Sequence, residues 1–250
     1  MVSMLKSEAA YRQFSRYYDE LTYDMPYALW LDIIHQFKGG RRSLLDIGCG
    51  TGNLTGMLEY EDISAFDQSG YMVAQAREKG PEDIGYFTDD MRYFELDRTF
   101  DVICATVDVL NYCQDPEEVM KVFTQVKKHL SDDGVFIFDI HSAYKMENEL
   151  NGVTYSDETE HITYIWHAIP GECPLSVIHD MTFFVRDEES GSMYRRFSET
   201  HAQRTYRHRD MIRMIDDAGL TLDFAFSDFD MDNAVTEVCD RVFYVVKKTL

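Results

Sequence analysis

A cluster of glycines and a later aspartate have the spacing of a site for a nucleotide-like ligand. Gly48, Gly50 and Gly52 directly follow a short apolar run, and Asp67 stands 19 residues after the first of them. Glycine has no Cβ, so the backbone can approach a ligand closely. An acid at this distance from a glycine turn typically accepts hydrogen bonds from ribose hydroxyls. The two segments are therefore predicted to hold a ribose-containing ligand together.

The residues around these glycines favour a cationic ligand over a pyrophosphate. The dinucleotide fingerprint GxGxxG has a third glycine where this chain has Asn53. Asp46 precedes the loop, and its negative charge would repel a pyrophosphate but attract a sulfonium or an ammonium group. S-adenosylmethionine carries both of these cations and no phosphate, so it fits the loop better than a dinucleotide does.

Three segments of the chain resemble motifs of one enzyme family. Leu44–Gly52 is similar to motif I of the class I S-adenosylmethionine-dependent methyltransferases. Phe66–Ser69 resembles the ribose-binding segment of that family, and Asp89–Arg92 resembles the segment that holds the adenine. Tyr17–Asp19 and Asp108–Tyr112 look like a bacterial subgroup that acts on small molecules and has an inserted β lid. The motifs occur in the family's order, and the resemblance covers nearly the whole chain.

The resemblance implies a role for each matching residue. The three glycines would line the methionine part of the cofactor, and Asp67 would bind the ribose hydroxyls. Asp90 would accept from the adenine amino group, with Met91 against the ring, while Tyr18 and Trp30 would close over the cofactor. The full expected cofactor site is Tyr18, Trp30, Asp46, Gly48, Cys49, Gly50, Gly52, Asp67, Gln68, Met72, Asp90 and Met91.

The expected reaction needs little catalytic machinery. Methyl transfer is an in-line displacement at a carbon that a positive sulfur already activates, so the protein mainly supplies alignment, which contributes on the order of 7–11 kcal/mol. A general base is needed chiefly when the nucleophile arrives protonated. Ligands of open α/β sheets lie outside the carboxyl ends of the strands. The candidates there are Asp108, His141 and Tyr144 for catalysis and Asn111 for substrate, with Tyr164 and Trp166 of the insertion as further substrate contacts.

The elements that must position these residues follow from hydrophobic periodicity. Apolar residues recur at helical spacing from Tyr11 to Phe37, and five apolar strands then alternate with helical segments as far as Ile140. One of these helices is expected directly after the glycine loop, from the spacing of Leu54, Met57 and Leu58. This alternation predicts an α/β fold with a doubly wound, mostly parallel, Rossmann-like sheet.

The periodicity changes from helical to alternating in the second half of the chain. Residues 151–206 carry aromatic-rich stretches of period two, separated by turn signals such as Glu188–Gly191, so we expect an inserted antiparallel β lid there. Residues 1–150 and 207–250 would form the cofactor-binding α/β domain with an N-terminal helical cap.

Composition excludes several classes of function. The 250 residues include 24 Lys+Arg and 45 Asp+Glu, for a net charge of −21, which disfavours nucleic acid and anionic membranes as partners. The five cysteines form no CxxC pair, and the histidines near the insertion show no metal-ligand spacing, so no metal is expected. No apolar stretch reaches the roughly 20 residues of a membrane helix. We expect a cytoplasmic monomer or homodimer that acts on a small-molecule methyl acceptor.

Three other functions remain open at this point, one of which is a use of S-adenosylmethionine other than methyl donation. Another is a non-catalytic cofactor-binding module with the same fold, because the sequence does not identify a catalytic base. An NAD-dependent oxidoreductase would share the spacing to Asp67, although Asn53 and Asp46 count against it. Turnover of S-adenosylmethionine would exclude the binding module, and binding of reduced nicotinamide would favour the oxidoreductase.

Overall fold

The structure is a computed structural model that describes residues 15–187 and 193–249. The first residues of the expected N-terminal helix, 11–14, and the Glu188–Gly191 turn lie outside the described residues. A helical segment at residues 15–21 comes first, followed by helix α2 (Tyr27–Gln36).

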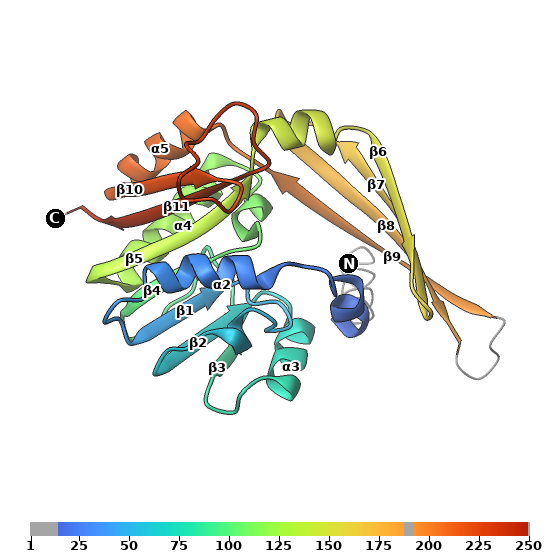
Figure 1. Cartoon of the computed structure of the whole chain (residues 1–250), viewed down its shortest axis with the longest axis horizontal. Coiled ribbons are helices and arrows are strands. Elements are labelled where there is room, and N and C mark those ends of the chain that lie inside the picture. Colours follow the sequence, from blue (N-terminus) through green and yellow to red (C-terminus); the bar gives the residue numbers. More distant parts are fainter. Residues whose placement is uncertain (1–14, 188–192, 250) are drawn as a thin grey trace.

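A seven-stranded sheet forms the body of the molecule, in the order β10-β11-β5-β4-β1-β2-β3 (Figure 1). Strands β1 to β5 are parallel, while β11 pairs antiparallel with both β5 and β10. The mostly parallel, doubly wound sheet expected from the alternating pattern is confirmed. Its strands are β1 (Ser43–Ile47), β2 (Asp62–Asp67), β3 (Gly85–Thr88), β4 (Phe100–Ala105), β5 (Leu130–His141), β10 (Leu220–Ser227) and β11 (Arg241–Lys248).

Helices cover both faces of this sheet and bury two apolar layers. On one face, α4 (Pro116–His129) and α5 (His208–Asp217) pack against residues such as Phe136 and Phe138. On the other face, α2 and α3 (Gly70–Lys79) pack against residues such as Ile137. Burial on both faces explains why the central strands are continuous apolar runs.

The prediction of a helix directly after the glycine loop is wrong. A single 3-10 turn, η1 (Thr55–Met57), replaces it, and Leu58 is already extended. Strand β2 begins at Asp62, so the chain has to turn back within a few residues, and Gly56 is a poor helix former. A turn this short lacks the aligned peptide dipoles that a helix N-terminus offers to an anion.

The insertion forms a separate four-stranded antiparallel sheet, called the inserted sheet below. Its strands, in spatial order, are β6 (Val153–Glu158), β7 (Ile162–Pro170), β8 (Ser176–Arg186) and β9 (Tyr194–Arg204). It extends away from the body, and the helical residues 15–21 lie beneath it (Figure 1). Met72 of α3, Tyr17 and Tyr18 of that helical segment, and Phe183 of β8 belong to one apolar cluster. The inserted sheet, the N-terminal helical segment and the body therefore pack together.

None of the described helices is long and apolar enough to span a bilayer.

Candidate functional site

The glycine loop and the end of β2 are joined by one carboxylate. Asp67 Oδ2 accepts a hydrogen bond from the Gly50 N–H at 3.0 Å, and Oδ1 accepts from the Ser69 N–H at 2.8 Å. Burial raises the pKa of Asp67, and these two backbone hydrogen bonds oppose that shift. The structure thus brings Gly50 and Asp67 together at the carboxyl edge of the sheet, as the sequence predicts.

Two glycines of the loop are required by close packing. Gly48 has a φ of +75°, and a Cβ there would collide with the side chain of Val109, the first residue of the 3-10 turn η2 (Val109–Tyr112). Gly52 has a φ of +79°, and a Cβ there would come within 2.9 Å of the Tyr86 hydroxyl oxygen. Cys49 lies between the glycines, half-buried, and burial raises its thiol pKa. The backbone of the loop therefore lies directly on its neighbours.

Asp46 is turned away from the loop surface. It is 3% exposed, and its carboxylate accepts from the Thr55 hydroxyl at 2.5 Å and from the Cys104 thiol at 3.4 Å. Burial raises its pKa to about 6. The carboxylate that the sequence places opposite a cationic ligand thus supports the loop from below, with both oxygens already engaged.

The segment after β3 is fixed by an arginine. Arg92 donates to both carboxylate oxygens of Asp90, at 2.9 Å and 2.6 Å, and the side-chain amide of Gln68 reaches Asp90 at 3.3 Å. The hydrogen bonds from Arg92 lower the pKa of Asp90. Met91 packs against the core. Asp90 is therefore ionised and fixed beside Gln68, and its oxygens keep lone pairs for a further donor.

Asp19 of the N-terminal helical segment contacts the glycine loop, a link that sequence reasoning missed. Its carboxylate accepts from the Thr51 hydroxyl at 2.6 Å, from the Asn53 side chain at 2.9 Å and from Lys79. Asn53, which stands where the dinucleotide fingerprint has glycine, is thus a partner of this helical segment. Only its position beside Tyr17 and Tyr18 in the sequence gave a signal for Asp19.

Trp30 lies in the core rather than over the loop. It is 2% exposed, and its indole N–H donates to Asp139 Oδ1 at 3.0 Å. Asp139 also forms an ion pair with Arg241, the first residue of β11, whose guanidinium lies 5.1 Å from the Trp30 ring centre. Trp30 was expected to close over the cofactor. In the structure it has a structural role instead, because it is buried and its only polar atom donates within this cluster.

Asp139 also holds a strained corner of backbone after β4. The N–H groups of Val107 and Asp108 donate to its two carboxylate oxygens at 2.8 Å and 3.1 Å. Both residues have a positive φ, 60° and 54°, which is rare for a β-branched residue such as Val107. Such strain persists where the surroundings hold it, often at functional sites. Asp139 interrupts an apolar strand, and this was the signal by which it could have been found.

The side chain of Asp108 connects this corner to the inserted sheet. It accepts from Arg241 at 3.1 Å and from the Gln203 side chain of β9 at 2.8 Å. Gln203 in turn contacts His179 at 3.0 Å, and His179 accepts from the Trp166 indole at 2.9 Å. Burial opposes ionisation of Asp108, but the adjacent His141 and Arg241 leave its pKa below the usual value.

Asn111, expected to contact substrate, is used by the backbone instead. It is fully buried, its amide nitrogen donates to the Arg204 carbonyl at 2.9 Å, and its oxygen accepts from the His141 N–H at 2.9 Å. Both ends of the amide are therefore occupied, and Asn111 links the last residue of β9 to the last residue of β5.

Of the other two catalytic candidates, His141 lies at the network and Tyr144 lies apart from it. His141 Nε2 is 3.6 Å from Asp108 Oδ2, and burial lowers the pKa of the imidazole to about 3. Such an imidazole is neutral at pH 7 and a weak base. Tyr144 is half-buried at the start of the π-helix η3 (Lys145–Glu149), and its hydroxyl has no hydrogen-bond partner in the described part of the chain.

The remaining aromatic candidates line the junction of helix and inserted sheet. Burial, followed by the nearby Tyr27, Tyr112 and Asp108, raises the pKa of Tyr18. Tyr18 also packs in the apolar cluster that contains Met72 of α3 and Phe183 of β8. Tyr164 packs beside Phe183, with ring centres 6.2 Å apart.

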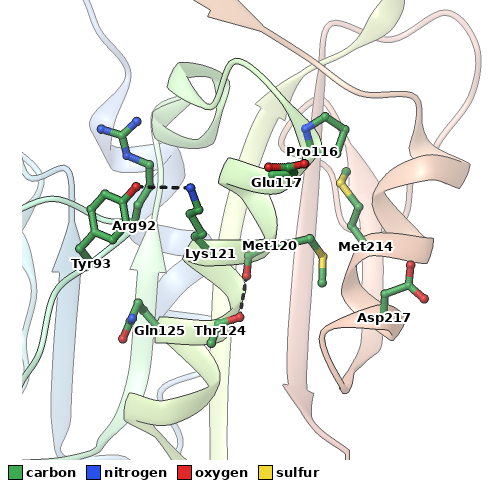
Figure 2. Close-up of a pocket in the computed structure, with 10 residues that line it drawn as sticks. All are labelled: Arg92, Tyr93, Pro116, Glu117, Met120, Lys121, Thr124, Gln125, Met214 and Asp217. Atoms are coloured by element: carbon green, nitrogen blue, oxygen red, sulfur yellow. Dashed lines mark hydrogen bonds between the residues drawn. The ribbon is translucent and has the colours of Figure 1, made fainter.

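A hollow elsewhere on the surface shares little with these residues. It measures about 510 Å³ and lies on the outer side of α4, where α5 contributes Met214 and Asp217 (Figure 2). Lys121 donates to the Tyr93 hydroxyl at 3.3 Å, and the Thr124 hydroxyl donates to the Met120 carbonyl at 2.8 Å. These polar groups already have partners, and no residue of the glycine loop lines the hollow.

Among residues 15–187 and 193–249, no group of three His, Cys, Asp or Glu residues has the arrangement of a metal site.

Comparisons with known proteins agree with this geometry. Residues 45–136 match the methyltransferase domain family. The chain is 34% identical to the "Putative methyltransferase" of Geobacillus sp. (strain WCH70), over 95% of this chain and 99% of that protein. It is 33% identical to the "Putative methyltransferase YqeM" of Bacillus subtilis (strain 168), over 96% and 97%. The crystal structure of an S-adenosylmethionine-dependent methyltransferase from Clostridium acetobutylicum ATCC 824 matches with a TM-score of 0.84 at 29% identity, covering 95% of this chain and 98% of that one.

Proposed function

Because the chain belongs to the class I S-adenosylmethionine-dependent methyltransferases, we propose that it methylates a nitrogen or oxygen atom of a small-molecule acceptor with S-adenosylmethionine as donor. The observation that carries this proposal is the hydrogen bond between the Gly50 N–H and Asp67. It ties the segment expected to bind methionine to the segment expected to bind ribose.

The space beside one glycine of the loop is open to a ligand. A Cβ placed on Gly50 meets no atom within 4 Å, so the space beside this residue is open, whereas Gly48 and Gly52 are closely packed. Asp67 uses two of its lone pairs on the N–H groups of Gly50 and Ser69, and about two remain for ribose hydroxyls. The residues present therefore fit a ligand that carries a ribose.

In this proposal each part of the site has one task. The loop would hold the methionine part, Asp67 the ribose, and Asp90 with Met91 the adenine. S-adenosylmethionine supplies a methyl carbon activated by its positive sulfur. The protein contributes alignment and exclusion of water, and the N-terminal helical segment, attached to the loop through Asp19, covers the cofactor.

The proposal is tested by the affinity for S-adenosylhomocysteine, measured by calorimetry. Asp67→Ala removes a charged acceptor, and hydrogen bonds to charged groups contribute about 1.5–3 kcal/mol, so affinity should fall roughly 10- to 100-fold. Asp62→Ala removes an exposed carboxylate from the opposite end of the same strand and should leave affinity unchanged. Unchanged affinity in the Asp67 variant would contradict the proposed site.

A further inference from the structure

Strand β9 carries an acidic residue on the face that looks toward the body. Phe197, Glu199, His201 and Gln203 alternate with more exposed residues along this strand, so they share one face of the inserted sheet. On β8 they lie opposite Phe183, Met181, His179 and Val177 respectively. Three of these β9 residues are buried and Phe197 is half-buried.

Contacts on either side of Glu199 show where this face points. Phe197 stacks on Tyr17 of the N-terminal helical segment, with ring centres 6.4 Å apart. On the other side, His201 Nδ1 lies 3.2 Å from the Tyr112 hydroxyl of η2. Glu199 lies between these two contacts on the strand, so it faces the junction where the helical segment, the strained corner and the inserted sheet meet.

The carboxyl group of Glu199 lacks a partner in the described part of the chain. The residue is 3% exposed, its Oε1 atom is shielded from solvent, and no described group donates a hydrogen bond to it. Burial raises the pKa of Glu199 to about 7. A buried carboxylate without a partner is costly to keep ionised. A ligand that brings a positive charge and N–H donors would remove this cost.

We infer that Glu199 binds the methyl acceptor, and that this acceptor is a basic amine held beneath the inserted sheet as its ammonium ion. The inference rests on the proposed function and names its substrate class. Phe197, two residues before Glu199 on the same face of β9, stacks on both Tyr17 and Phe183, so this side of the site is apolar and suits the carbon frame of the amine.

The pairing also prepares the amine for reaction. One proton passes from the ammonium nitrogen to a Glu199 oxygen, which leaves a neutral carboxylic acid and a neutral amine with a free lone pair. Because burial brings the pKa of Glu199 to about 7, its carboxylate is a better proton acceptor than that of an ordinary glutamate. Glu199 is therefore both the binding group for the cation and the base that releases the nucleophile.

The test compares a charged and an uncharged probe of the same shape. Binding of cyclohexylammonium and of cyclohexanol is measured by ligand-observed NMR at about pH 8, where Glu199 is ionised, with S-adenosylhomocysteine present. The wild-type protein should prefer cyclohexylammonium. Glu199→Gln keeps the shape of the side chain and should weaken cyclohexylammonium roughly ten-fold or more, with cyclohexanol unchanged.

Controls separate this inference from the proposed function. Glu158→Gln removes an exposed carboxylate from β6 and should leave both probes unaffected, which excludes a general effect of net charge. If Glu199→Gln binds cyclohexylammonium as tightly as the wild type does, or if the wild type shows no preference for the amine, the inference is overturned. Failure of the wild type to bind S-adenosylhomocysteine would instead overturn the proposed cofactor, whatever the probes do.

Discussion

At the scale of single residues, His141 sets an expectation for stability against pH. Burial lowers the pKa of this imidazole to about 3, against 6.5 for an ordinary histidine, although the adjacent Asp108 opposes the shift. Between these two values the unfolded chain binds a proton that the folded protein does not. Stability therefore falls as pH drops through this window, and His141 alone should cost about 2 kcal/mol between pH 7 and pH 5.

A variant without the imidazole isolates this effect. Urea unfolding of the wild type and of His141→Gln at the two pH values should show a smaller loss of stability for the variant. His201 is also buried, with its pKa lowered to about 4, but it titrates in both proteins and cancels in the comparison. Equal losses in the two proteins would mean that folding does not lower the pKa of His141.

Residue roles could be predicted where the backbone motif determined them. The proximity of Asp67 and Gly50 follows from strand order and from a short connection, and the structure shows their hydrogen bond. The partners of Asp139 could not be predicted, because Trp30 and Arg241 reach it from 109 and 102 positions away. Asn111 was misread for a related reason, since a buried amide can serve a ligand or the backbone, and only the fold decides which.

At the scale of elements, the N-terminal helical segment depends on one carboxylate for its contact with the glycine loop. Asp19→Ala removes the hydrogen bonds from Thr51 and Asn53 and the ion pair with Lys79. The ion pair is partly exposed, so the expected loss is only about 1 kcal/mol. If this segment covers the cofactor, S-adenosylhomocysteine should dissociate about five-fold faster, as measured by a chase of the radiolabelled ligand.

Asp24→Ala is the matched control for this experiment. Asp24 is an exposed carboxylate just beyond the same helical segment, so its removal changes the net charge equally. Its dissociation rate should match that of the wild type. An unchanged rate in Asp19→Ala would indicate that the helical segment does not cover the ligand.

Elements were predictable where their periodicity was long and unbroken. Helix α4 is such an element, because its apolar stripe and its Asp115 cap are both local in the sequence. The helix expected after the glycine loop failed because three apolar residues at helical spacing do not reveal how soon β2 begins. The start of β5 is hard to predict for a similar reason: Asp132 and Asp133 resemble a turn, yet they lie within the strand.

At the scale of the whole molecule, the relation between body and inserted sheet lay beyond sequence reasoning. Alternation in residues 151–206 predicted antiparallel strands, because each strand carries its own pattern. The joining contacts pair residues that share no pattern, such as Gln203 with Asp108 and Phe197 with Tyr17. Only the folded chain brings these surfaces together.

Net charge belongs to this same scale and opposes the compact state. The 45 acidic and 24 basic residues leave a net charge of −21, so even complete pairing of the basic groups leaves unmatched acids that repel one another. Salt also weakens exposed ion pairs such as Arg42–Glu61, but each of these contributes only about 0.2–1 kcal/mol. Screening of the repulsion should therefore have a larger effect on stability than the weakening of these ion pairs.

An increase from about 0.01 M to about 0.2 M KCl shortens the Debye length from about 30 Å to below about 10 Å, which is less than the width of the molecule. We expect Tm to rise by about 2–4 °C, which corresponds to roughly 1 kcal/mol for a chain of this size. Choline chloride at the same ionic strength should give the same rise, because screening does not depend on the identity of the cation. A rise with KCl alone would indicate specific cation binding, and a fall in Tm with both salts would show that ion pairs outweigh the repulsion.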